Sequence, residues 1–499
     1  MSRKISFLDK MFWVTESKAN PKHVAGIQIL EMPEGAAQDY VEKLHAELQT
    51  FTDAASPFNC RVSSFLGYPI RLKPIDKLDM DYHVQLHEIA DLNDKVEIHQ
   101  FVAQLHETWL DRDKPLWQYH LIKDRSNTRF AIYVKVHHMC GDGATLIRIF
   151  QRGYAETKND ENFVPVWATK AERRPRKKAN IFKRILGGIW GFVVTIFDIL
   201  WILFRLLVKI LRLNTHYMPV PFSGTKTVLT GQVKKGRAVS TVELDFNRVT
   251  RLSKRLRASA NEIMLCAFDI AVHRFLKDYG HTFDKALYTN MPINLRKPGE
   301  LTGGNKIAIV PVKLAFGQKD PYLRLRQIIE NHRIVKHAAS VSHPAAFSYY
   351  TLLIQSFSLL FELLRVSDWV RPIGNILISN MPGPKNELYF KDARLLSTCP
   401  VSTMTPGGGL NITMVTYNGV AQIGLVCCNT KIKDLEPVSR YFLEAFELLE
   451  DCIDDPSLDT DCIGEQDEEP PKTIVEEEIL PEDEIVDEGE VGIGKLHQA

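Results

Sequence analysis

Two adjacent histidines, His137 and His138, end the apolar run at residues 130–136 and have the side chains that proton transfer requires. A neutral imidazole accepts a proton from a hydroxyl, and burial keeps it neutral because an apolar environment lowers the pKa of the ring. Alternate residues of a strand face the same side, so His138 is predicted to face the same side as Val136 and Val134. The pattern therefore predicts that His138 faces a dry interior and acts as a general base.

A sharp turn and a helix must position this pair. Gly141 and Gly143 suit a tight turn that a Cβ atom would block, and a helix is expected from residue 144 onward. Asp142 stands where a carboxylate caps such a helix, which is one interpretation of this residue. His137 points to the opposite side of the strand and is expected to hold the strand end by hydrogen bonding. Adjacent histidines on a strand diverge and no third ligand follows at metal spacing, so no metal site is predicted.

The periodicity of the chain indicates two large α/β domains. Strand-like alternation and helical stretches mix within residues 1–170 and again within residues 216–450, and 499 residues exceed what one core holds. Residues 171–215 form a basic and apolar linker between them. The acidic tail at residues 451–499 has almost no aromatic side chains, so we expect it to be disordered and assign it no chemistry.

The linker contains a run of apolar residues at 185–204 in which Asp198 is the single charge. Twenty residues could span a bilayer. However, Asp198, Arg205, Lys209 and Arg212 are spaced so that a helix would gather them in one narrow polar stripe. We therefore favour a helix that lies in a membrane interface, with a helix packed on the protein's own core and a true span as the alternatives.

The net charge of +1 conceals a strong asymmetry. The stretch at 450–490 contains 19 acidic residues and one basic residue, which leaves about +18 on residues 1–449. A basic body suits an anionic partner, such as the phosphates of a nucleotide cofactor or lipid head groups. Nucleic acid is not expected, because no nucleic-acid-binding pattern accompanies the charge. The eight cysteines form no disulfide framework and no signal peptide is evident, which indicates a cytoplasmic protein.

The spacing His-His-x-x-x-Asp-Gly at residues 137–143 resembles the signature of the CoA-dependent acyltransferase superfamily. Further blocks narrow the resemblance to the bacterial wax ester synthase/acyl-CoA:diacylglycerol acyltransferase family. They are Ser6 to Asp9, Asp79 to Val84, Leu110 to Trp117, Asn261 to Ile263, Pro292 to Arg296, Gly374 to Asn375 and Ser379 to Pro384. Glu262 stands where that family usually has aspartate, and its spacing from Ser259 suits a helix capping box.

The resemblance implies two chloramphenicol-acetyltransferase-like domains, each a mixed sheet with flanking helices, and a channel between them. It implies transfer of a long-chain acyl group from acyl-CoA to a fatty alcohol or diacylglycerol, with no cofactor and no covalent intermediate. His138 would be the base, and Asp142 would form a structural salt bridge with Arg296. The residues that the family places along the channel are Asn261, Ser379, Asn380, Pro115, Leu116 and Trp117.

Several alternatives stay open. His138 could be an ordinary core histidine, Asn261 could serve only the helix end, and Trp117 could anchor the core. The enzyme could be a condensation-type catalyst for another alcohol or an amine, or the chain could be a non-catalytic protein that coats membranes or lipid droplets. The motifs rank neither fatty alcohol against diacylglycerol nor one chain length against another, because channel shape sets both.

Overall fold

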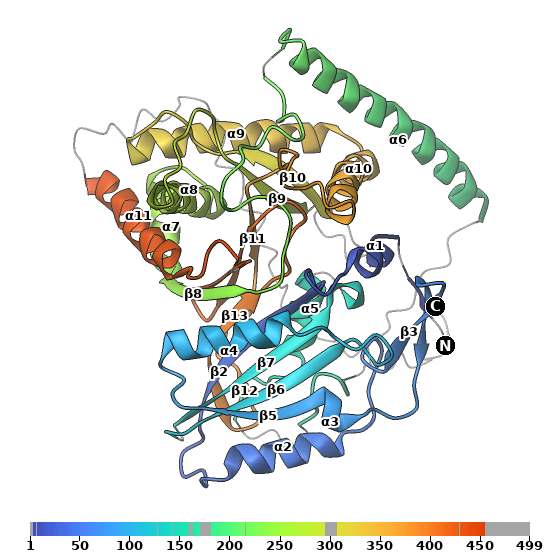
Figure 1. Cartoon of the computed structure of the whole chain (residues 1–499), viewed down its shortest axis with the longest axis vertical. Helices are drawn as coiled ribbons and strands as arrows, with labels where there is room; N and C mark the ends of the chain where they lie inside the picture. The colour runs from blue at the N-terminus through green and yellow to red at the C-terminus, as the bar shows by residue number, and fades with distance from the viewer. Residues whose placement is uncertain are drawn as a thin grey trace, which may run out of the picture.

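Two six-stranded sheets and one small three-stranded sheet form the β structure of this computed structural model (Figure 1). The structure describes residues 3–5, 7–126, 128–141, 143–158, 163–169, 181–214, 216–294, 307–428 and 430–454. Both large sheets mix parallel and antiparallel neighbours, and helices flank each of them. The predicted α/β class with two mixed sheets is confirmed.

The first large sheet has the strand order β12-β13-β2-β7-β6-β5. Its inner strand β7 ends at His137, the first residue of the histidine pair. Helix α2 packs on one face and α4 on the other, so both faces of β7 are buried. Alternate residues of β7 consequently enter two different apolar cores, Ile132 in one and Tyr133 in the other. The elements of this half are β1 (Arg3–Lys4), α1 (Phe7–Thr15), β2 (His23–Glu31), α2 (Tyr40–Thr50), β3 (Cys60–Phe65), β4 (Tyr68–Pro74), α3 (Met80–His83), β5 (Val84–Ile89), α4 (Lys95–Glu107), β6 (Trp117–Asp124), β7 (Arg129–His137) and α5 (Gly143–Gln151).

The second large sheet has the order β10-β9-β11-β14-β15-β8. Helix α8 is buried along most of its length, because the sheet, α7, α9 and α11 surround it. The elements of this half are α6 (Ile181–Ile210), β8 (Ala238–Asp245), α7 (Phe246–Arg255), α8 (Ala260–Asp278), β9 (Tyr288–Asn294), β10 (Ile307–Lys313), α9 (Pro321–Val341), α10 (Pro344–Leu363), β11 (Ile376–Met381), β12 (Tyr389–Phe390), β13 (Ala393–Val401), β14 (Leu410–Tyr417), β15 (Val420–Cys427) and α11 (Glu436–Asp454).

Strands β12 and β13 leave the second half and complete the first sheet, with β13 antiparallel to β2. The predicted boundary between two domains at residue 216 does not anticipate that β12 and β13 join the first sheet. Pairing between strands several hundred residues apart leaves no local pattern in the sequence. Strand β13 also packs against β15 of the second sheet, where a Cβ on Gly424 would collide with the carbonyl oxygen of Pro400. The two sheets are therefore joined by packing of β13 against β15 and by the close backbone contact between Pro400 and Gly424.

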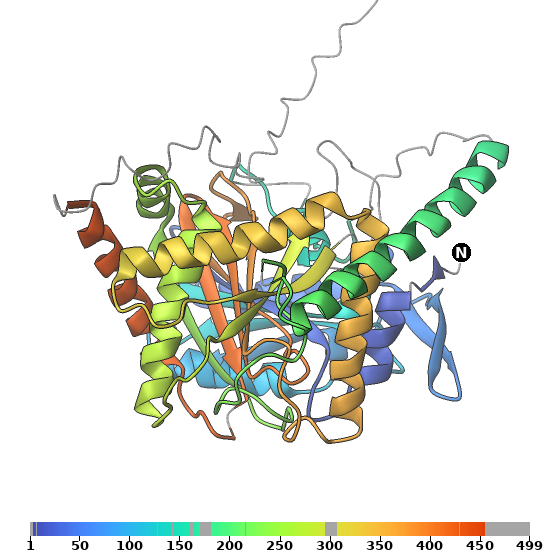
Figure 2. The same cartoon turned by 90° about the horizontal axis from the view of Figure 1, so that it is seen from above.

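Three residues of the predicted charged stripe, Asp198, Arg205 and Lys209, face the protein, whereas Arg212 lies beyond the end of α6 and is exposed. Asp198 accepts a hydrogen bond from the backbone N–H of His343, and Lys209 donates to the carbonyl oxygen of Tyr217. Ile202 and Leu206 are buried beside them. Among the side chains of α6 that the structure describes, at 194–210, the exposed large apolar ones are Ile196, Phe197, Leu200, Trp201, Leu203, Phe204, Leu207 and Ile210. Figure 2 shows α6 crossing α10 and extending away from the rest of the chain. Of the helices in the described ranges, none combines the length and apolar character needed to cross a bilayer.

Buried histidines make the fold sensitive to acid. Burial lowers the pKa of His83 to about 4, that of His99 to about 4 and that of His106 to about 3, all below the unfolded value of 6.5. Between these values the unfolded chain binds more protons than the folded chain, so stability is full above pH 6.5 and falls as the pH drops toward 4.

We expect the free energy of unfolding to fall by about 2–5 kcal/mol over this interval. Denaturant titrations from pH 7 to pH 4 measure it. His83→Gln keeps a donor for the carbonyl oxygen of Trp117, which His83 Nδ1 contacts at 2.9 Å, and is expected to make the pH dependence shallower. A stability that does not change between pH 6.5 and 4.5 would contradict the prediction.

Candidate functional site

His138 lies just beyond the end of β7, in a short 3₁₀ turn that covers His138–Cys140. Its backbone N–H donates to the carbonyl oxygen of Lys22 (2.8 Å), and its ring stacks on Phe12 of α1 with centroids 4.1 Å apart. The residue is half-buried, and Nδ1 of its ring is shielded from solvent. His138 lies beyond the strand end, so the alternation of β7 does not by itself fix the direction of this ring.

His137 is the fully buried member of the pair. Its Nδ1 accepts a hydrogen bond from the backbone N–H of Met139 (3.1 Å), which leaves the ring proton on Nε2. Nε2 lies 3.3 Å from Oε1 of Glu16. The ring is thus fixed in one tautomer and spans from the turn that carries His138 to a buried carboxylate.

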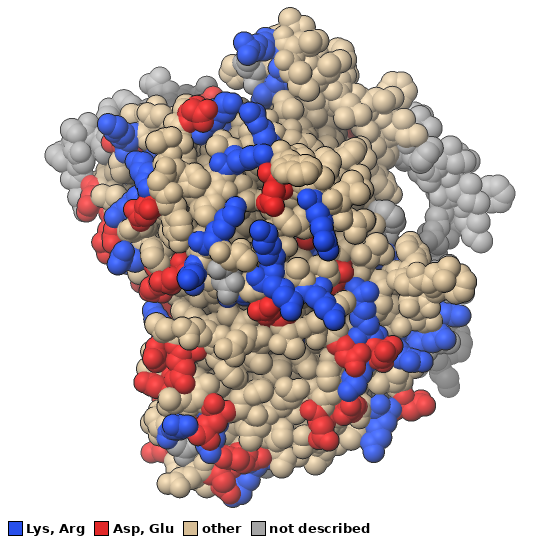
Figure 3. All heavy atoms as spheres, in the orientation of Figure 1, with Lys and Arg blue, Asp and Glu red and all other residues tan. Residues whose placement is uncertain are grey.

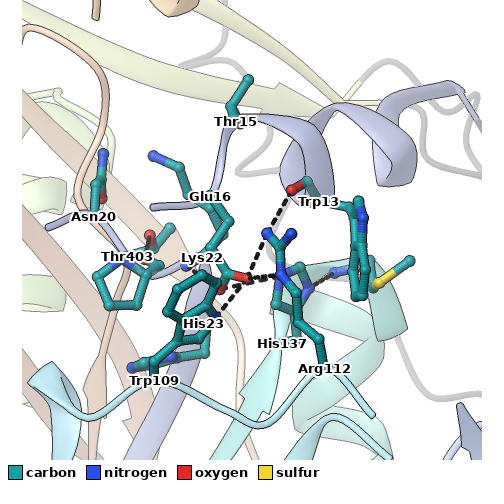
Figure 4. A network of polar contacts seen from close by, with 12 residues as sticks. Trp13, Thr15, Glu16, Asn20, Lys22, His23, Trp109, Arg112, His137 and Thr403 are labelled. Carbon is teal, nitrogen blue, oxygen red and sulfur yellow. Dashed lines mark hydrogen bonds and ion pairs between the residues drawn. The ribbon is translucent and has the colours of Figure 1, made fainter. Parts of the chain in front are cut away.

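Glu16 is the centre of a buried polar network that also includes Arg112 and Trp109 (Figure 4). Oε2 accepts from Nε1 of Trp109 (2.8 Å) and from Nε and Nη2 of Arg112 (3.2 and 3.1 Å). Oε1 accepts from the backbone N–H of Lys22 (3.1 Å). Burial alone would raise the pKa of Glu16, but the contact with His137, the Lys22 N–H and the Arg112 charge outweigh it and hold the pKa below its usual range. Glu16 is therefore an ionised carboxylate.

Gly143 begins α5 and touches the second half of the chain. A Cβ at this position would lie 2.6 Å from Sδ of Met381, the last residue of β11. The motif turn and the end of β11 therefore meet so closely that an added Cβ would force the Met381 side chain or the turn to shift. This contact joins the start of α5, directly after the motif turn, to the strand end that carries Ser379 and Asn380.

We expect Gly143→Ala to lower acyl transfer about 10- to 100-fold, because displacement of a catalytic turn by about 1 Å costs that much. Met381→Ala in the same chain removes the colliding sulfur and is expected to restore most of the rate. Steady-state rates of the two variants measure this, with Gly153→Ala as control, since a Cβ on Gly153 makes only ordinary contacts. Equal activity of Gly143→Ala and wild type would refute the argument.

Asn261, Ser379 and Asn380 line one small cavity of about 40 Å³. Nδ2 of Asn380 donates to Oδ1 of Asn261 (2.7 Å), which joins the start of α8 to the end of β11. The remaining lining is mostly apolar and comes from α8 and from three strands of the second sheet: Met264, Leu265, Phe268, Met291, Pro292, Ile378, Ile412 and Met414. The structure thus brings together the three polar residues that the resemblance assigned to the channel wall, although this cavity lies within the second half.

Glu262 caps α8 as its spacing predicts. The N–H of Ser259 donates to Oε2 of Glu262 (2.8 Å), and Oγ of Ser259 accepts from the N–H of Glu262 (3.4 Å). The carboxylate also contacts Nδ1 of His332 of α9 (2.8 Å), which the sequence did not indicate. Burial raises the pKa of Glu262, and the His332 and Ser259 contacts outweigh it and lower the pKa to about 2. This carboxylate fixes the helix that begins beside Asn261.

Pro115, Leu116 and Trp117 do not line that cavity, so the channel role predicted for them is not supported. All three are buried. Nε1 of Trp117 donates to the carbonyl oxygen of Phe58, and its ring stacks on His83. The carbonyl oxygen of Leu116 accepts from the N–H of His137 (2.9 Å). These residues stabilise β7, the strand that ends at His137, because β6 pairs directly with β7 in the sheet.

Asp142 and Arg296 lie outside the described residues, so their salt bridge stays a prediction. Within the described ranges, no three His, Cys, Asp or Glu side chains gather as metal ligands would. The residues of the site that sequence reasoning missed are Phe12, Glu16 and Met381. Nothing local distinguishes them, since a carboxylate after a helix end or a methionine at a strand end usually has no functional role.

Two family models cover most of the chain. The wax ester synthase/diacylglycerol acyltransferase catalytic domain matches residues 5–264, and the WS/DGAT C-terminal domain matches residues 303–450. The chain belongs to the wax ester synthase/diacylglycerol acyltransferase family. The resemblance inferred from the sequence is confirmed, and the chain is an acyltransferase.

Named relatives span the same length. The O-acyltransferase WSD of Acinetobacter baylyi is 24% identical over 468 residues, which cover 90% of this chain and 98% of the relative. A putative diacylglycerol O-acyltransferase of Mycobacterium tuberculosis is 27% identical over 451 residues, and the alignment covers 90% of this chain and 100% of that relative.

Solved structures show the same fold. The wax ester synthase/diacylglycerol acyltransferase of Marinobacter aquaeolei VT8 aligns with a TM-score of 0.70 at 23% identity, and covers 90% of this chain and 99% of its own. The starter condensation domain of rhizomide synthetase aligns with a TM-score of 0.55 at 12% identity, and covers 93% and 96%. The expected fold, two acyltransferase-like units with mixed sheets, is therefore confirmed.

Proposed function

We propose that this acyltransferase moves a long-chain acyl group from acyl-CoA to a fatty alcohol, to diacylglycerol, or to both. The observation that carries the proposal is the placement of His138. Its half-buried ring is held against Phe12, and its turn meets Met381, the neighbour of Asn380 at the cavity. The turn that carries the proposed base therefore contacts the strand end next to a small, mostly apolar cavity.

His138 takes the proton of the acceptor hydroxyl as its oxygen attacks the thioester carbonyl. The tetrahedral intermediate carries an oxyanion, and the amide of Asn261, oriented by its bond to Asn380, is the proposed donor to it. Collapse of the tetrahedral intermediate breaks the C–S bond, and the imidazolium of His138 gives its proton to the CoA thiolate. Ester and free CoA leave, and His138 is neutral again.

Glu16 and His137 act as positioning residues in this scheme. The carboxylate fixes the tautomer of His137, whose Nδ1 in turn holds the Met139 N–H next to the base. Asp142 and Arg296 are proposed to brace the same turn through a salt bridge. The thioester donor is proposed to place its phosphates on the basic body of the protein. Figure 3 shows Lys and Arg side chains gathered across the middle of one face.

The protein is further proposed to work in the cytoplasm at the inner membrane or at lipid droplets, where its lipid substrates reside. The exposed apolar face of α6 supports this, because its charged stripe is already bound by the protein and leaves aromatic side chains outward. Phe197, with 73% of its surface exposed, and Trp201, stacked on Phe204, suit an interfacial position.

Phe197→Ser together with Trp201→Ser is expected to lower vesicle binding about tenfold or more, because two large apolar side chains no longer leave water. Flotation of the full chain with lipid vesicles measures it. Leu323→Ser on α9 removes one exposed apolar side chain elsewhere and should leave binding unchanged. Binding that survives the double substitution would remove α6 from the proposal.

The test of the chemistry is an assay of purified protein with palmitoyl-CoA and either hexadecanol or dioleoylglycerol. Thiol release and the ester product are both measured, so that hydrolysis is not mistaken for transfer. Ester from either acceptor supports the proposal and ranks the two. Failure to form ester from both would refute it and would favour a condensation-type acceptor such as an amine.

A further inference from the structure

The hairpin of β3 and β4 projects from the body of the protein and exposes an apolar tip. Phe65 pairs with Tyr68 across a two-residue turn, Leu66 and Gly67, whose φ angles are 50° and 79°. Leu66 has 92% of its surface exposed and Phe65 has 68%. Figure 1 and Figure 2 both show β3 at the outer edge of the molecule.

Leucine is a poor choice for this turn. Both central positions of such a turn need positive φ, which favours glycine, asparagine or aspartate. The backbone of Leu66 is therefore strained, and its side chain is almost fully exposed to water. Burial of this side chain consequently contributes nothing to the stability of the fold. A strained and exposed apolar residue indicates a contact that forms outside the folded chain.

The stem of the hairpin is basic. The small sheet β1-β4-β3 contains five basic residues and no acidic residue: Arg3, Lys4, Arg61, Arg71 and Lys73. Arg61, Arg71 and Lys73 are exposed beside the tip. Apolar side chains flanked by cations match an anionic bilayer, in which head groups attract the cations and the acyl boundary receives the apolar tip.

The hairpin is attached to the site. Nε1 of Trp13 donates to the carbonyl oxygen of Gly67 in the turn (3.0 Å), and Lys10 lies over the ring of Tyr68. Both residues belong to α1, whose Phe12 stacks on His138. Figures 1 and 2 place α1 and the hairpin on the same side as the free end of α6.

We propose that the tip formed by Phe65, Leu66 and Tyr68 inserts into the interface of an anionic phospholipid bilayer and holds α1, whose Phe12 stacks on His138, against the lipid. This docking element is separate from α6, and the proposed chemistry does not require it. Its role is to bring a lipid acceptor from the bilayer directly to α1.

The experiment uses full-length protein with Phe65→Ser and Leu66→Asn combined. Asparagine suits positive φ, so the fold is expected to keep or gain thermal stability. Partition onto vesicles of phosphatidylcholine with phosphatidylglycerol is expected to fall about tenfold or more. Val96→Asn, which changes a similarly exposed side chain on α4, should bind as wild type. Arg71→Ser and Lys73→Ser should each lower binding about fivefold and reduce its salt dependence.

Hydrogen exchange of the wild type gives a direct readout. Vesicles with phosphatidylglycerol are expected to slow exchange across residues 60–74, and vesicles of phosphatidylcholine alone to slow it less. Unchanged partition of the double variant, or equal protection by both vesicles, would overturn the proposal. So would a change in oligomeric state on substitution, because the tip would then be a contact between copies. Transfer from palmitoyl-CoA to a water-soluble alcohol tests the chemistry separately, since it does not need the bilayer.

Discussion

Replacing His138 by alanine is expected to abolish ester formation almost completely. A positioned general base contributes about 10²–10⁴-fold to the rate, and here the same ring is proposed to return the proton to the leaving thiolate. We therefore expect a loss of about 10³-fold or more in kcat, with little change in stability because the ring is half-buried at a turn.

The measurement is thiol release from palmitoyl-CoA in the presence of hexadecanol or dioleoylglycerol. His337→Ala, which removes an exposed histidine of α9, is the matched control and should keep full activity. Circular dichroism verifies that both variants fold. Release from the His138 variant at the wild-type rate would mean that this imidazole is not the base.

The second large effect is expected at Glu16, chiefly in stability. Glu16→Ala leaves the guanidinium of Arg112 and the N–H of Trp109 without their buried acceptor. Breaking a buried ion pair from one side costs about 3–5 kcal/mol, so the alanine variant should unfold far more readily. Glu31→Gln, in an exposed pair with Arg394, is the control and should cost about 1 kcal/mol or less.

Glu16→Gln separates positioning from packing. The amide keeps the shape and one acceptor oxygen but loses the charge, and its N–H₂ cannot accept from Nε2–H of His137 or from the donors of Arg112 and Trp109. We expect kcat to fall about tenfold with KM unchanged, because the turn that carries His138 loosens while the substrate sites persist.

The folded pKa of Glu16 lies below the unfolded value of 4.5, so its contribution to stability is present above pH 4.5 and lost below it. The glutamine variant should lack this decrease in the free energy of unfolding at acid pH. If its kcat equals that of the wild type, the role of Glu16 is structural only.

Much of the fold was predictable because it depends on local periodicity. The helix after Ser259, the strand before His137 and the long helix of the linker all form where their patterns indicate. The capping box of α8 also formed as its spacing predicts. These features involve residues a few positions apart, which the backbone geometry brings together in any fold.

The site was predictable in its parts and less so in its arrangement. The motif identified the histidine pair, and His137 hydrogen-bonds at the strand end as predicted, whereas His138 is half-buried against Phe12 in the turn after the strand. Trp117 belongs to the core, and the stripe of α6 binds the protein. In both cases a side chain's surroundings depend on a neighbour distant in sequence.

The sequence by itself determined the α/β class, the histidine motif and the family, because each follows from residue types at short spacing. The tertiary structure alone decided that Glu16 meets His137, that Met381 closes on Gly143, and that β13 completes the first sheet. These contacts join residues more than a hundred positions apart. Their formation depends on how whole sheets and helices pack, and no local pattern of side chains encodes which distant partner will fill a given space.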